Sequence, residues 1–188
     1  MNGVIEALKN NSKLNEESKK NIMEIVNIIY SKSHVNNFTN LINRLSNLEI
    51  IEKPLKNQVI KLENNQIVID PNQIRYYDQK LALTSVIIEA MRLNTDFNTI
   101  TEPISLGFNE SYAQSLVGVE GRPRYEEEQV YARMLGKMIG DDNLINIYFM
   151  GNMPVDLPNY LLRSGCKEAD IKKLLTMIYQ NYKNRNIR

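Results

Sequence analysis

Histidine and cysteine are scarce in this sequence, and each shortage excludes a class of site. His34 is the only histidine among 188 residues, so one chain cannot build a zinc site with two or three imidazole ligands. A Ser-His-Asp triad could use only His34, and its polar neighbours indicate a surface loop. Cys166 is the only cysteine, so no internal disulfide can form, and a reducing compartment is favoured.

An excess of positive charge is also lacking. The chain has 23 Lys and Arg against 22 Asp and Glu, whereas proteins that bind nucleic acids or membrane surfaces usually carry a basic excess. The basic residues of the tail, 179–188, suit the end of a helix in any case. No apolar run reaches the roughly 18 residues of a membrane span, and the first 20 residues lack the apolar core of a signal peptide. We therefore expect a cytoplasmic protein with no nucleic-acid partner and no membrane partner.

Apolar residues recur with a helical period over most of the chain. Acidic residues in the first turn and Gly140 after the last residue mark the helix from Tyr125 to Ile139 most clearly. The predicted helices are Asn15 to Ser31, Asn36 to Leu48, Tyr125 to Ile139, Asp142 to Met150, Leu157 to Arg163 and Glu168 to Tyr182.

A change of period between these helices indicates a β-hairpin. Two runs rich in β-branched residues, Val59 to Leu62 and Ile67 to Ile69, enclose Asn64-Asn65. Asparagine tolerates the left-handed conformation that a tight turn requires. We expect the hairpin to end at Pro71.

The segment from Tyr76 to Leu93 is apolar on nearly every side, which is typical of a central, buried helix. After it, Thr95 to Gly107 is predicted to be a loop, because Pro103 and Gly107 break helices. A short helix from Asn109 to Val117, with Asn109 as its N-cap, is predicted to follow.

These elements predict a mainly helical α+β protein. We expect one domain over residues 1–188, a number of residues that can bury a substantial core. Its parts would be a helical N-terminal region to about residue 55, a hairpin over about 57–70 and a helical core over about 76–182.

Glu89 and Arg92 interrupt this apolar segment, and buried charges need partners. The run Ile88-Glu89-Ala90-Met91-Arg92 can be laid on the motif H-E-x-x-H, in which two histidines one helical turn apart bind zinc and the glutamate is the general base. The glutamate is kept and both histidines are replaced. Asn109-Glu110 follows, with Glu110 18 residues after Arg92.

This order of motifs resembles zincin-like metallopeptidases of the gluzincin type from Firmicutes, over about Asn57 to Gly151. In those proteins a glutamate, often within an Asn-Glu pair, is the third zinc ligand. The resemblance implies a zincin-like fold with a small sheet beside a buried central helix. The features that match are Asn109-Glu110, Tyr125, Ile139-Gly140, Tyr148-Phe149 and Gly151.

The resemblance also assigns roles to the residues at the centre. Ile88 and Arg92 stand at the first and second ligand positions, Glu110 at the third, and Glu89 at the general base. Isoleucine has no lone pair, and arginine stays cationic and does not bind zinc. We therefore expect no metal and no cofactor, and only vestigial positions remain. Arg92 is predicted either to bridge Glu110, and with it Glu89, in place of the metal, or to extend to solvent.

Two functions follow as hypotheses. The first is a catalytically inactive peptidase relative that binds a protein or peptide, for example by adding a strand to the hairpin edge. The alternative is a metal-free hydrolase that uses Glu89 and Glu110 as a carboxylate pair. It requires both acids to face an open pocket, with their pKa values pushed apart.

Overall fold

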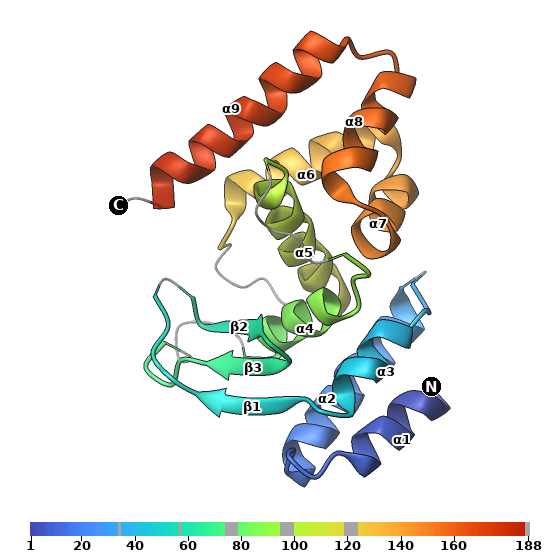
Figure 1. Cartoon of the computed structure of the whole chain (residues 1–188), viewed down its shortest axis with the longest axis vertical. Coiled ribbons are helices and arrows are strands. Elements are labelled where there is room, and N and C mark those ends of the chain that lie inside the picture. The colour runs from blue at the N-terminus through green and yellow to red at the C-terminus, as the bar shows by residue number, and fades with distance from the viewer. Residues whose placement is uncertain (34, 57, 74–78, 95–99, 119–123, 187–188) are drawn as a thin grey trace. The chain divides into compact units, whose positions relative to one another are not determined.

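The computed structural model describes residues 1–33, 35–56, 58–73, 79–94, 100–118 and 124–186. In these residues the chain forms nine α-helices and one three-stranded sheet (Figure 1). The protein is thus α+β and mainly α, as its sequence predicts. None of the described helices is long and apolar enough to cross a membrane. His34 lies outside the described residues.

Packing divides the chain into two compact units. The first comprises residues 1–91 and 112–122, and the second comprises residues 92–111 and 123–188. Helix α5 (Glu102–Val117) begins in the second unit and ends in the first. Neither unit is therefore one continuous stretch of chain, and the expectation of a single domain stays a prediction.

The first unit opens with three helices, α1 (Asn2–Asn10), α2 (Glu16–Lys32) and α3 (Thr39–Leu45). The prediction of α2 is confirmed, and α3 is shorter than predicted at both ends. The Asn15 side chain caps α2 by accepting a hydrogen bond from the Ser18 amide at 2.8 Å. Helix α1 was not predicted.

Asn11 holds the loop after α1 to the end of α3. Its amide nitrogen donates to the carbonyl oxygens of Leu45 and Leu48, at 2.6 and 2.9 Å. Its amide oxygen accepts from the backbone of Lys13 and Leu14. A single buried side chain therefore satisfies backbone groups of both segments.

The sheet contains β1 (Glu49–Glu52), β2 (Ile60–Glu63) and β3 (Gln66–Ile69), in the order β1-β3-β2. The predicted hairpin is confirmed, since β2 and β3 pair antiparallel around Asn64 and Asn65. Both asparagines have positive φ, 46° and 65°, as a two-residue type I′ turn requires. Strand β1, parallel to β3, was not predicted.

Helix α4 (Gln79–Ala90) is the buried central helix of the first unit and packs against α2, α3 and β2. It ends three residues before the predicted Leu93, while residues 76–78 lie outside the described part. The Met91 amide still donates to the carbonyl oxygens of Ile87 and Ile88, both at 3.2 Å, but the chain then leaves the helix. The Leu93 amide donates to the carbonyl oxygen of Phe149 at 2.8 Å, so the helical hydrogen-bond pattern does not continue.

Helix α5 contradicts the prediction of a loop up to Gly107. Pro103 is its second residue, where the missing amide hydrogen is not needed. Gly107 does not break the helix but allows α5 to approach α6. A Cβ there would overlap the carbonyl of Glu128 and lie 2.6 Å from the nitrogen of Gln129. Asn109 therefore lies inside the helix and is not its N-cap.

The second unit contains four further helices, which confirm the predictions for this region with small shifts of their ends. Arg185 joins the last helix to the first of them by ion pairs with Glu127, at 3.0 Å, and Glu128. The four are α6 (Glu126–Ile139), α7 (Asp141–Met150), α8 (Met153–Arg163) and α9 (Glu168–Asn186).

Candidate functional site

Ile88 and Glu89, the first of the predicted site positions, belong to α4 in the first unit. Ile88 is fully buried in the core, and Glu89 beside it is half-buried. The position that the resemblance assigns to the first metal ligand is thus an ordinary aliphatic core position. A zinc ligand there would need a side chain with a lone pair, which isoleucine lacks.

Arg92 belongs to the second unit and lies beyond the last residue of α4. Arg92 therefore does not belong to the helix that contains Ile88. Only 3% of Arg92 is exposed, so it does not extend to solvent either. Its Nε donates to the carbonyl oxygen of Tyr148 at 3.2 Å, and its guanidinium lies 4.4 Å from the centre of the Tyr148 ring.

Tyr148 is the residue around which this buried group is built. Its hydroxyl accepts a hydrogen bond from the side-chain amide of Asn109 at 2.6 Å. Its ring contacts Phe108 and Phe149, with centroids 4.6 and 5.0 Å apart. Arg92, Asn109 and Tyr148 thus connect the start of the second unit to α5 and α7. Tyr148 and Phe149 are both buried in the core, with 1% and 2% exposed.

Glu110, at the predicted third ligand position, is also buried, with 3% exposed. Burial raises the pKa of its carboxyl to about 7, while the positive charge of Arg124 acts in the opposite direction. The Tyr125 hydroxyl has a raised pKa because of burial, to which the charges of Glu110, Glu128 and Glu102 add. Arg124 is thus the cation that acts on Glu110, and the bridge from Arg92 stays a prediction.

Among the side chains that the structure describes, no group of three His, Cys, Asp or Glu residues is arranged to hold a metal ion. Isoleucine at position 88 and arginine at position 92 supply no metal ligand.

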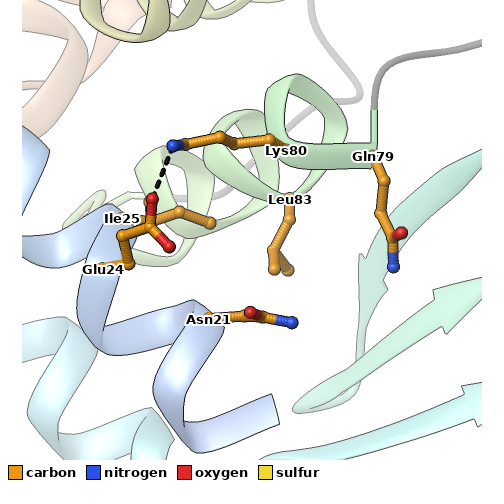
Figure 2. Close-up of a pocket in the computed structure, with 6 residues that line it drawn as sticks. All are labelled: Asn21, Glu24, Ile25, Gln79, Lys80 and Leu83. Carbon is orange, nitrogen blue, oxygen red and sulfur yellow. Dashed lines mark hydrogen bonds and ion pairs between the residues drawn. The ribbon is translucent and has the colours of Figure 1, made fainter. Parts of the chain in front are cut away.

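A pocket in the first unit lies between α2 and α4 and has a volume of about 300 Å³. Figure 2 shows the side chains of Asn21, Gln79 and Leu83 pointing into the same gap between the two helices. Two carboxamides, which both donate and accept hydrogen bonds, thus line the same pocket as the apolar side chains of Leu83 and Ile25. The sequence did not reveal this site, because neither amide belongs to a motif.

An ion pair closes one side of this pocket. The Lys80 ammonium lies 2.6 Å from the carboxylate of Glu24 (Figure 2). The hydrogen bond and charge of Lys80 lower the pKa of the Glu24 carboxyl. Both side chains are about half exposed, so this pair contributes little to stability and can open at small cost.

Comparison with family models, curated proteins and solved structures finds no match to this chain. The chemistry of the sites is therefore the guide to function.

The buried contacts of Arg92 predict that Arg92→Ala lowers the free energy of unfolding by about 2–4 kcal/mol, because a charged hydrogen bond and a buried cation–π contact are lost. Urea unfolding measures the change. Arg163→Ala is the matched control, since Arg163 lies 5.6 Å from the Tyr160 ring but is exposed. The control should lose less than about 1 kcal/mol. Equal effects of the two changes would contradict the buried role.

Burial of Glu110 predicts a pH-dependent stability. Its folded-state pKa, about 7, is above the value of an exposed carboxyl, so the folded state binds more protons between pH 4.5 and 7. Stability should therefore fall as pH rises through this window, by an amount on the order of 3 kcal/mol. Glu110→Gln should remove this fall, and Glu126→Gln, at an exposed position, should keep it. Parallel pH profiles of wild type and Glu110→Gln would contradict the assignment.

Proposed function

We propose that this protein is a catalytically inactive, metallopeptidase-like protein that binds an extended peptide segment of a partner protein. The motif order around Glu89 and Glu110 supports the metallopeptidase-like part of this function. The pocket between α2 and α4 supports the binding part. The observation that carries the binding role is the pair of carboxamides, Asn21 and Gln79, which line one pocket with the apolar side chains of Leu83 and Ile25.

Loss of catalysis is supported by the residues at the ligand positions. Ile88 is an aliphatic core residue, and Arg92 is engaged with the backbone and ring of Tyr148. A cation at this position would repel a second cation such as zinc. A metal site at these positions would require substitution of both residues and a different backbone conformation after α4.

Peptide binding is supported by the shape and chemistry of the pocket. A peptide presents alternating amide groups and side chains. The amides of Asn21 and Gln79 can pair with its backbone, while Leu83 and Ile25 can contact one apolar side chain. The volume of about 300 Å³ suits one side chain with its adjoining backbone, which favours a segment of a partner that only partly enters the pocket.

The sheet of the first unit lies beside this site (Figure 2). In the sheet formed by the described residues, β2 is an outer strand, and it packs against α4. Gln79, the first residue of α4, lies on the side of the pocket nearest the strands (Figure 2). An extended peptide held by Gln79 could therefore add to the outer strand through main-chain hydrogen bonds.

The alternative of a metal-free hydrolase is less well supported. The raised pKa of Glu110 suits a general acid. However, only 3% of Glu110 is exposed. Acid–base catalysis requires both groups to reach a substrate, so binding is the better supported function.

We expect the purified protein to retain much less than one zinc ion per chain after exposure to zinc and extensive washing, because Ile88 and Arg92 supply no ligand. Elemental analysis measures the bound metal. Near-stoichiometric zinc would contradict the inactive part of the proposal, and an assay for peptide hydrolysis would then be required.

We expect a random peptide library selected on the immobilised protein to yield extended sequences with a recurrent apolar residue. Fluorescence anisotropy then measures the affinity of a selected peptide. Asn21→Ala and Gln79→Ala should each weaken binding about fivefold, the effect of one lost hydrogen bond of about 1 kcal/mol.

The control is Asn27→Ala, an exposed amide on the same helix that does not line the pocket. It should leave the affinity unchanged. Selected peptides that bind all three variants like the wild type would contradict the pocket assignment. A selection that yields no binding peptide would contradict the proposed function.

A further inference from the structure

Another pocket of the first unit, which we call the α1–α2 pocket, lies between these two helices and has a volume of about 330 Å³. Each helix contributes one face to it, because the lining residues recur every three or four positions along both helices. None of these residues lines the pocket between α2 and α4. The two pockets are therefore separate sites, and a ligand of the α1–α2 pocket does not depend on the proposed peptide function.

Three side chains that line the α1–α2 pocket are apolar. Leu8 is buried, with 4% exposed, whereas Ile5 is 36% exposed. Met23 belongs to α2, and its unbranched, polarisable side chain adapts to the shape of a ligand. An apolar ligand that covers these side chains removes apolar surface from water, which favours binding.

Lysines from both helices line the same pocket. Lys9 belongs to α1, whereas Lys19 and Lys20 belong to α2. Lys19 is paired with Glu16 across 2.9 Å. In the part of the chain that the structure describes, Lys9 and Lys20 form no ion pair, and both are exposed. The pocket therefore presents two unpaired ammonium groups to a ligand.

The carboxylate of Glu24, one turn beyond Lys20 on α2, does not cancel these charges. The hydrogen bond and charge of Lys80 contribute most to the lowered pKa of Glu24, and the charge of Lys20 contributes least. Glu24 is held by Lys80 at 2.6 Å and lines the other pocket. The positive charge of Lys20 therefore stays available at the α1–α2 pocket.

We propose that the α1–α2 pocket binds an amphipathic carboxylate with an unbranched apolar chain, such as a medium-chain fatty acid. The chain covers Ile5, Leu8 and Met23, and the carboxylate accepts charge-assisted hydrogen bonds from Lys9 and Lys20. An elongated chain fits because the lining stretch of α2, residues 16–23, extends about 10 Å at a rise of about 1.5 Å per residue.

Both parts of this ligand are needed to match the pocket. Inorganic phosphate would pair with the lysines but leave the apolar side chains in contact with water. A neutral hydrocarbon would cover the apolar side chains but offer no partner to the two ammonium groups. A carboxylate on an apolar chain satisfies both.

Sodium octanoate is the probe, and NMR of the methionine methyl groups reports its binding. The Met23 signal, identified by Met23→Leu, should shift during the titration, because the chain contacts this side chain. Affinity should rise about fourfold per added methylene from butyrate to octanoate, since each buried methylene contributes hydrophobic free energy. No shift of the Met23 signal at millimolar octanoate, or no dependence on chain length, would overturn the proposal.

The role of charge is tested by a neutral ligand and by substitution of the lysines. 1-Octanol has the same chain without the charge and should bind several-fold more weakly. Lys9→Gln and Lys20→Gln should each weaken octanoate binding about threefold to fivefold, and the loss should shrink as salt screens the charges.

Lys13→Gln is the matched control, because Lys13 is an exposed lysine between the two helices that does not line the pocket. It should leave the affinity unchanged, and circular dichroism verifies that all three variants fold. Equal affinities of the three variants, or binding of 1-octanol as tight as that of octanoate, would overturn the role of Lys9 and Lys20.

Ile5→Ser tests where the apolar chain lies. It should weaken octanoate binding more than butyrate binding, because the longer chain covers more of this side chain. Val155→Ser, at a residue of α8 that is 54% exposed, is the control and should change neither affinity. Equal losses for the two acids in Ile5→Ser would overturn the placement of the chain.

Discussion

Helix α4 has almost no polar face to offer to water, and this constraint shapes the first unit. Eight of its 12 residues are buried, so other elements must cover it on several sides. Helices α2 and α3 and strand β2 provide that cover. The polar residues that line the pocket or hold the chain after α4 therefore lie near the ends of the helix. Gln79 and Lys80 stand at its start, where the pocket lies, and Arg92 follows its end.

Arg92 shows how a charged residue is accommodated next to an apolar helix. It lies past the end of α4, where its guanidinium meets a carbonyl oxygen and the face of Tyr148. Asn109 then satisfies the Tyr148 hydroxyl. Such a group is stable only when its buried polar atoms find partners. Glu110 is also buried, and burial favours the protonated, uncharged form of its carboxyl.

The proposed peptide pocket belongs wholly to the first unit. Such a site requires no metal and no nucleophile, which agrees with a chain that carries isoleucine and arginine at the ligand positions.

Local chemistry by itself determined several elements of this protein. The Asn64-Asn65 pair specified the hairpin turn, Asn15 capped α2, and the apolar run before Glu89 specified a buried helix. Each of these depends on residues within a few positions of one another. Only the tertiary structure decided the parallel pairing of β1 with β3, the helical conformation of Pro103 and Gly107, the contacts of Arg92 and the pocket that Asn21 and Gln79 both line. These features depend on partners far apart in the chain, and local propensity carries no information about which distant groups will meet.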